Sequence, residues 1–199
     1  MLVRGFSLIE VLVSLLILGL GLLGIVALSA HGQRAYVEST QRSEATRYVE
    51  EMADRIRANT QVAQDPTFIR FYVDPAGSAT PDLLGDGSEF DDVLGTAPTG
   101  VNCNTSVCTP QQLALFDRAW WDGLLSGQVS DLGLIGAVGC ITQVPGVLPR
   151  ARVSLAWQGM RDTLDSGGAN GPLAAITCGD VAFAGDLSSR RLVSLEVAL

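Results

Sequence analysis

The sequence contains no lysine, so arginine supplies all 13 basic residues of the 199. It has one histidine, His31, which excludes most metal and acid–base sites built on imidazole. Acidic residues number 21 and the net charge is −8. Nucleic acid is therefore not an expected partner, because its phosphates must be neutralised by clustered cations.

Catalytic motifs are also absent from the sequence. We find no nucleophile elbow, no phosphate loop and no pair of metal-binding histidines. The chain is therefore expected not to be an enzyme and to need no cofactor or metal. Hydrophobic residues, in contrast, make up 47% of the chain, which excludes wholesale disorder, and the length fits one domain with an appended segment.

The longest hydrophobic run covers residues 6–30, FSLIEVLVSLLILGLGLLGIVALSA. As a helix it would be roughly 37 Å long, enough to cross a hydrocarbon core of about 30 Å. We therefore predict a membrane span. A buried core helix is one alternative. Another is a secretory signal cut near Ala27-Leu28-Ser29, although such signals have a shorter apolar stretch.

One carboxylate, Glu10, lies inside this run. An acidic side chain at the centre of a membrane helix costs about 2.5 to 3.5 kcal/mol, so it usually has a partner or a task. The alternative is that Glu10 lies near the end of the span and reaches the head-group layer at a smaller cost. The residues alone leave both interpretations open.

The segment GFSLIEVL, residues 5–12, follows a five-residue leader and precedes the apolar run. It resembles the prepilin motif of type IV pilins and type II secretion pseudopilins. In that family a prepilin peptidase cuts after the glycine and methylates the new terminal amine, and a glutamate at the fifth mature position guides assembly. The resemblance implies cleavage between Gly5 and Phe6, methylation of Phe6, and Glu10 as the assembly carboxylate.

This arrangement has a physical reason. Cleavage creates a cationic amine at the membrane boundary, and a cation near a carboxylate offsets the desolvation of both groups. Loss of Arg4 with the leader leaves 12 basic and 21 acidic residues, a net charge of −9. Charge does not set the orientation, because Arg34 and Arg42 follow the span. The resemblance implies a cytoplasmic leader and an external domain.

Three glycines, Gly19, Gly21 and Gly24, form a G-x-G-x-x-G pattern within the run. No strand precedes it, so a dinucleotide site is rejected. Each glycine weakens a helix by about 1 kcal/mol relative to alanine. The resemblance implies that this zone loses helix in fibres. Close packing of helices through small residues is the alternative, and the two are compatible.

The sequence predicts four segments: a leader (1–5), a transmembrane and assembly helix (6–30), its amphipathic continuation (31–58) and a globular periplasmic domain (59–199). Apolar residues at helical spacing carry the helix to about Ala58. Alternating patterns predict strands at 136–144, 150–157 and 191–199, with a fourth candidate within 173–183. These patterns predict the α+β fold class with an antiparallel sheet. The resemblance implies a type IV pilin-like fold, in which the long helix packs on that sheet.

Residues 60–109 are rich in Pro, Gly, Asp and Ser, which predicts loops with short ordered pieces. The stretch DLLGDGSEFDD, residues 82–92, fails as an EF-hand because Leu84 and Val93 stand at ligand positions. A solvated acidic loop is expected there.

A capping box, Thr109 with Gln112, predicts a helix from Pro110 that stops near Gly127. Its apolar face is predicted to comprise Leu113, Phe116, Trp120 and Leu124. We expect Trp121 to be partly buried beneath a loop rather than to be a contact residue.

The four cysteines, Cys103, Cys108, Cys140 and Cys178, all follow the span. An even number on an exported side favours disulfides, for which three pairings exist. We favour Cys103 with Cys108, which closes a short loop, and Cys140 with Cys178, which would clamp the end of the sheet. A four-cysteine zinc site is the alternative, but its usual paired spacing is missing.

The resemblance is strongest over residues 5–30 and weaker over DRAWWDGLL, GCITQ and RVSLAW. It is closest to minor pilins of the PilV type. It implies a structural subunit that helps prime or cap type IV pilus assembly, with other minor and major pilins, prepilin peptidase, the inner membrane and the assembly machinery as partners. The chain would span the inner membrane once before assembly and lie in the pilus fibre afterwards.

Two alternatives remain open. The first is a minor pseudopilin of a type II secretion system, which shares the motif. The second is a signal-anchored exported binding module or hydrolase with a prepilin-like start by chance. N-terminal sequencing of the mature protein separates the second from the pilin interpretation.

Overall fold

The structure is a computed structural model that describes residues 7–65, 69–73, 82–95, 100–129, 134–144, 150–160, 173, 176–183 and 187–198. It contains two compact units, Met1–Thr40 and Gln41–Leu199. The expected cleavage site between Gly5 and Phe6 lies outside the described residues.

Helix α1, Leu8–Ala58, begins in the first unit and continues into the second. The large apolar side chains between Leu8 and Leu28 are all exposed. An 18-residue window of this helix has a mean hydropathy of 2.9 and contains no buried residue. The helix is therefore long and apolar enough to cross a membrane. Its apolar surface needs a cover that the first unit does not supply.

In the second unit α1 is amphipathic and ends at Ala58, where the sequence pattern also ends. Its buried side chains recur at three- and four-residue spacing, so they share one face. Short elements follow: α2 (Thr60–Ala63), the 3-10 helix η1 (Ile69–Phe71) and α3 (Ser88–Leu94). The buried face of α1 consists of Gln41, Ala45, Tyr48, Val49, Met52, Ala53 and Ile56.

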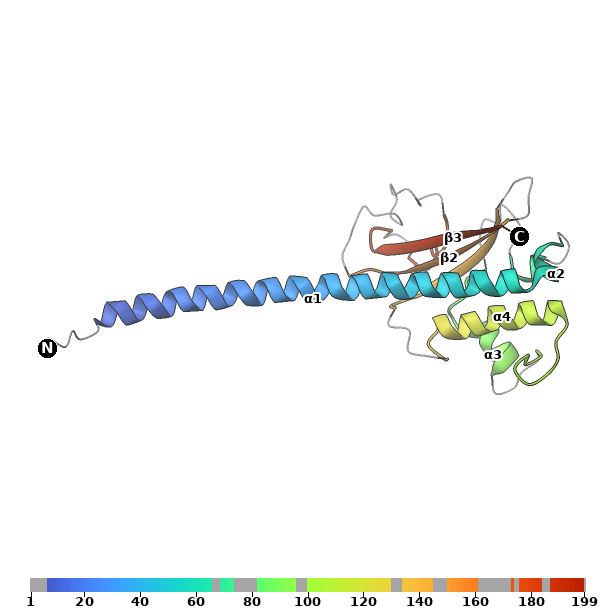
Figure 1. Ribbon diagram of the computed structural model, residues 1–199, viewed down its shortest axis with the longest axis horizontal. Coiled ribbons are helices and arrows are strands. Elements are labelled where there is room, and N and C mark those ends of the chain that lie inside the picture. The colour runs from blue at the N-terminus through green and yellow to red at the C-terminus, as the bar shows by residue number, and fades with distance from the viewer. Residues whose placement is uncertain are drawn as a thin grey trace. The chain divides into compact units, whose positions relative to one another are not determined.

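Three strands form an antiparallel sheet in the order β1-β2-β3, namely β1 (Val138–Val144), β2 (Arg150–Gln158) and β3 (Arg190–Ala198). Val153, Leu155 and Trp157 of β2 pack in the main core with the buried face of α1. On the opposite face Ala156 packs in a second cluster with the disulfide-bonded Cys140. In Figure 1 the sheet and helix α4 (Pro110–Leu125) lie on either side of this part of α1. The α+β class and the helix on an antiparallel sheet are confirmed.

The fourth candidate strand is wrong for the residues described, because 176–183 form turns. Cys178 is tied by its disulfide to Cys140 of β1. The buried Arg190 donates from Nη1 to the carbonyl oxygens of Ile176 at 3.1 Å and Cys178 at 2.9 Å. These backbone carbonyls are satisfied by a side chain, so they need no partner strand.

Helix α4 starts as predicted, with the Thr109 side chain accepting from Gln112 N and the Gln112 side chain accepting from Thr109 N. The tryptophan assignment was wrong. Trp121 is fully buried and donates from Nε1 to the Tyr48 carbonyl at 3.1 Å. Trp120 is only half-buried and stacks on Phe116 with ring centroids 6.2 Å apart. The buried face of α4 is rotated relative to the predicted apolar face, because charged residues of α4 are themselves buried.

Candidate functional site

The first candidate site is a groove on the N-terminal part of α1. Glu10 lies in the first turn of the helix, and the groove has a volume of about 240 Å³. The Ser14 hydroxyl donates to the Glu10 carbonyl oxygen at 2.7 Å. Glu10 is the one ionisable side chain in residues 7–30. Any counter-charge for it within the span must therefore come from another chain or from the terminal amine. The groove is lined by Glu10, Val11, Ser14, Leu15 and Leu18.

The three glycines of the span, Gly19, Gly21 and Gly24, are all helical in α1. A Cβ atom added to any of them would meet no atom within 4 Å. Packing inside the described chain therefore does not require glycine at these positions. Glycine would be required at these positions only if neighbouring helices pack closely there or if the helix must be weakened there.

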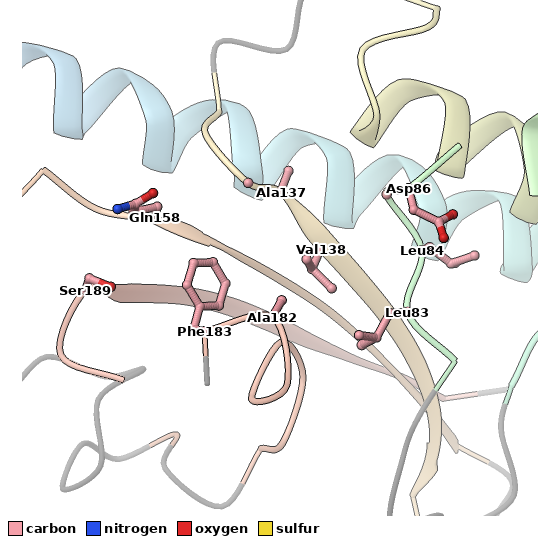
Figure 2. A pocket seen from close by; sticks show the side chains of 11 residues that line it. Leu83, Leu84, Asp86, Ala137, Val138, Gln158, Ala182, Phe183 and Ser189 are labelled. Atoms are coloured by element: carbon pink, nitrogen blue, oxygen red, sulfur yellow. The ribbon is translucent and has the colours of Figure 1, made fainter. Parts of the chain in front are cut away.

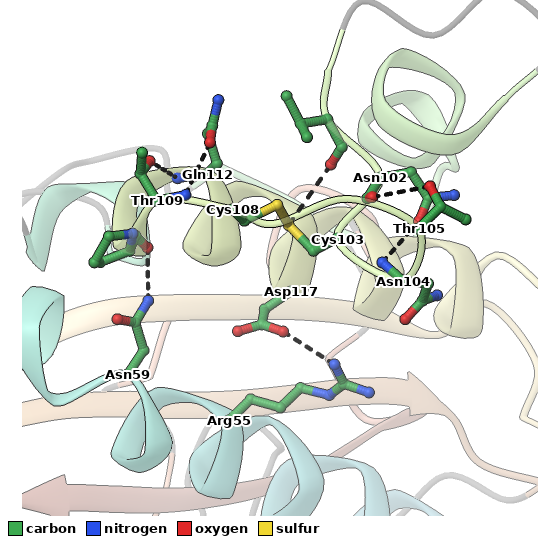
Figure 3. The surroundings of a disulfide bond; sticks show 12 residues. Arg55, Asn59, Asn102, Cys103, Asn104, Thr105, Cys108, Thr109, Gln112 and Asp117 are labelled. Carbon is green, nitrogen blue, oxygen red and sulfur yellow. Dashed lines mark hydrogen bonds and ion pairs between the residues drawn. A yellow bond between two sulfur atoms is a disulfide. The ribbon is translucent and has the colours of Figure 1, made fainter.

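A buried polar network joins the end of α1 to η1 and α4. The Tyr72 hydroxyl donates to Asp117 Oδ2 at 2.6 Å, and Arg55 Nη1 lies 3.0 Å from Asp117 Oδ1. Asn59 Nδ2 donates to the Pro110 carbonyl at 2.7 Å and to the Tyr72 hydroxyl at 3.2 Å. Figure 3 shows Arg55 of α1, and Asn59 just after the end of α1, reaching toward α4. The network fixes the start of α4 on α1.

Burial controls the titration of this network. The pKa of Tyr72 is raised far above its ordinary value, first by burial and then by the adjacent Asp117 carboxylate. Burial also raises the pKa of Asp117, although hydrogen bonds from Tyr72 and Arg55 oppose the shift. The pKa of Arg55 is lowered by burial, but its bonds to Asp117 and Glu51 outweigh this and leave the pKa raised. The polar groups of this network are hydrogen-bonded to one another and to the backbone of α4, which is the arrangement of a structural network.

The acidic side chains Asp82, Asp86, Asp91 and Asp92 are exposed, as composition predicts, but the stretch 82–92 is not a loop throughout, because it enters α3. The buried Asp122 carboxylate accepts hydrogen bonds from the backbone N–H groups of Gly85, Gly87 and Phe90. These bonds hold the stretch against α4 and lead it into α3. Asp86 stabilises the turn before α3, because its carboxylate accepts hydrogen bonds from the Ser88 backbone N–H and hydroxyl at 2.9 and 2.7 Å.

A guanidinium occupies the centre of this acidic stretch. Arg118 of α4 is buried and pairs with Glu89 and, at 3.4 Å, with Asp82. Within the described ranges, no three His, Cys, Asp or Glu side chains are grouped so that they could hold a metal ion. An EF-hand is a calcium-binding loop, and the described residues of this stretch add no support for such a site. The sequence analysis did not predict that charged residues of α4 are buried. The segment DRAWWD could have indicated it, because its charged residues share a helix face with tryptophan.

Both disulfides have the favoured pairing. Cys103 is bonded to Cys108, and Cys140 is bonded to Cys178. Figure 3 shows the first bond closing a short loop just before α4. Asn104 within this loop donates from its backbone N to Oδ1 of Asn102, which precedes the loop, at 2.9 Å. The second bond joins β1 to the 176–183 turns. Since the four cysteine sulfurs form two disulfide bonds, a zinc site made of these cysteines is excluded.

The largest pocket described has a volume of about 690 Å³ and lies beside the start of β1. Figure 2 shows Leu83, Val138 and Phe183 contributing apolar side chains to it. Asp86, Gln158 and Ser189 are the polar side chains of its lining. Among the described residues of this lining the titratable side chain is that of Asp86.

Comparison with known protein families decides the nature of the N-terminal segment. Residues 1–26 match the family model of the prokaryotic N-terminal methylation motif. The chain therefore carries a type IV pilin-like leader. No curated protein and no solved structure matches it.

The methylation motif covers Gly5, Phe6, Glu10 and the glycine zone, and it ends before the second unit begins. It supports a type IV pilin-like or pseudopilin-like precursor and suggests a prepilin peptidase substrate in a pilus system. The motif points to a structural protein. The long apolar helix that carries it is able to anchor the chain in a membrane.

Proposed function

We propose that this protein is a minor pilin, most like the PilV type, which helps prime or cap type IV pilus assembly. Its leader, residues 1–5, is removed after Gly5, and the new amine on Phe6 is methylated. The inner membrane holds residues 6–30 before assembly, with the domain in the periplasm. Other minor and major pilins then pack against the same helix.

One observation carries this proposal: a carboxylate without an intrahelical counter-charge lies in the methylation motif of an otherwise apolar, exposed helix. A buried carboxylate is stable when a cation lies within a few ångströms of it. Cleavage after Gly5 produces such a cation on a neighbouring chain. Pairing of the two would align adjacent helices, and the exposed apolar surface would pack between subunits.

Glu10→Val tests the role of the carboxylate. We expect the variant to enter the membrane and lose its leader as the wild type does, because the substitution makes the span more apolar. Its incorporation into pili, relative to its amount in the membrane, should fall at least about tenfold if the ion pair contributes about 1.4 kcal/mol or more. Normal incorporation would count against the proposal.

Sequencing of the mature N-terminus separates this function from a signal-anchored exported module. Methyl-phenylalanine at residue 6 supports the pilin-like role, whereas a start at Ala30 or an intact Met1 would contradict it. A pseudopilin of a type II secretion system would give the same terminus. Co-purification of the protein with pilus components, rather than with secretion components, distinguishes these two structural roles.

A further inference from the structure

The Glu10 groove contains a second polar side chain that the methylation motif does not explain. Ser14 lies one helical turn after Glu10 and lines the same groove. The rest of the lining is apolar, formed by Val11, Leu15 and Leu18. A hydroxyl in such surroundings is expected to have a hydrogen-bonding role, because an unmatched polar group in hydrocarbon is costly.

The hydrogen bond that Ser14 makes within the helix determines whether its hydroxyl can act as a donor or as an acceptor in the groove. Its single hydroxyl proton is donated to the Glu10 carbonyl oxygen at 2.7 Å. The hydroxyl oxygen therefore retains only acceptor capacity toward the groove. Together with the Glu10 carboxylate, the groove presents two side-chain acceptors and no side-chain donor.

We propose that Ser14 is a positioning residue that accepts a hydrogen bond from the terminal ammonium of a second processed chain bound at Glu10. This inference rests on the proposed function, which already supplies the occupant of the groove: an N-methylated ammonium on an apolar first residue. Such a group is cationic, and residues 7–30 supply no cation of their own.

The number of donors fits the number of acceptors. An N-methylated terminal ammonium keeps two N–H groups, whereas an unmethylated one has three. One N–H binds the Glu10 carboxylate and the other binds the Ser14 oxygen, so neither donor remains unsatisfied in the apolar groove. The side chain of the first residue then contacts Val11, Leu15 and Leu18. A guanidinium, with five donors, would leave several of them unmatched.

The test compares Ser14→Ala, Ser14→Thr and the matched control Ser29→Ala in the full-length protein in its host. Ser29 undergoes the same chemical change on the same helix, but it lies outside the groove. We expect Ser14→Ala to lower incorporation into pili about three- to tenfold, which is the range for one interhelical hydrogen bond in a membrane. Ser14→Thr, which keeps a hydroxyl, should restore it, and Ser29→Ala should match the wild type.

A second readout reports on the contact itself. A photo-crosslinking amino acid at position 18 should capture the first residues of a neighbouring chain, and Ser14→Ala should lower that yield without changing leader removal or membrane insertion. Wild-type incorporation of Ser14→Ala, failure of Ser14→Thr to rescue, or an equal loss in Ser29→Ala would overturn the inference. If Ser14→Ala is normal and Glu10→Val is defective, only the role of Ser14 falls. If Glu10→Val is also normal, the proposed function falls with it.

Discussion

At the scale of single residues, the structure separates two kinds of acidic side chain. Asp117 and Asp122 are buried on α4, and each has defined partners on other elements. Glu10 is exposed on α1 in the single chain. The buried pair therefore stabilises the fold, whereas Glu10 is available to another molecule.

The network around Tyr72 predicts a loss of stability at alkaline pH. Because the folded-state pKa of Tyr72 lies above its unfolded value of about 10, its stabilising contribution is present below pH 10 and declines above it. We expect the free energy of unfolding to fall as the pH rises above about 10, and Tyr72→Phe to flatten that fall. Urea unfolding of the full-length protein in detergent at each pH measures it. Tyr36→Phe changes an exposed tyrosine and is the control; an equal effect there would contradict the assignment.

Asp122 predicts a large cost for a small truncation. Asp122→Ala would leave the N–H groups of Gly85, Gly87 and Phe90 without their acceptor. We expect a loss of about 3 kcal/mol in unfolding free energy, since hydrogen bonds to a charged acceptor contribute about 1.5 to 3 kcal/mol each and solvent entry offsets part of the sum. Hydrogen exchange over 85–90 should accelerate. Asp91→Ala, an exposed carboxylate in the same stretch, should change neither measurement.

At the scale of elements, α1 has two environments along its length. Its large apolar side chains are exposed in the first unit, whereas in the second unit one face is buried in the main core. The helix thus combines a surface suited to lipid or other helices with a surface that organises a domain. Glycine is concentrated in the first of these parts.

The glycine zone predicts a separation between insertion and assembly. Replacing Gly19, Gly21 and Gly24 by alanine should stabilise the helix by about 1 kcal/mol per residue in water, and nothing in the described chain obstructs the added Cβ atoms. We expect normal membrane insertion and reduced incorporation into pili, measured as the ratio of the two fractions. Gly32→Ala, equally unobstructed but outside the zone, is the control. Full incorporation of the triple variant would show that neither helix loosening nor close approach is needed.

At the scale of the whole molecule, the disulfides agree with an external domain. Both bonds lie in the second unit, and such bonds persist in oxidising compartments rather than in the cytoplasm. The first unit contains no cysteine. The proposed orientation therefore places every cysteine on the oxidising side.

Thiol counting tests that orientation. Alkylation of the denatured, unreduced protein from its host should modify no cysteine, and alkylation after reduction should modify four. A form retained in the cytoplasm should expose all four thiols without reduction. Mass spectrometry reads both outcomes. Four free thiols in the membrane-bound protein would contradict a periplasmic domain.

The leader motif, the apolar span and the amphipathic end of α1 could be read from the sequence, because each is a local pattern along one helix. The disulfide pairing and the start of α4 were also accessible, since loop length and a capping box are local features. The candidate site at Glu10 came entirely from such local information. Ser14 could have been noticed as the polar residue one turn further along.

Tertiary structure alone decided which face of α4 is buried, why 176–183 do not form a strand, and how the acidic stretch is held. Each outcome depends on a buried charge that meets its partner across the fold: Asp117 with Tyr72, Arg190 with two carbonyls, and Asp122 with backbone N–H groups. A hydropathy pattern predicts that such charged side chains are exposed to solvent. Only three-dimensional contact supplies the hydrogen bonds that offset their desolvation, and a periodic pattern contains no record of those partners.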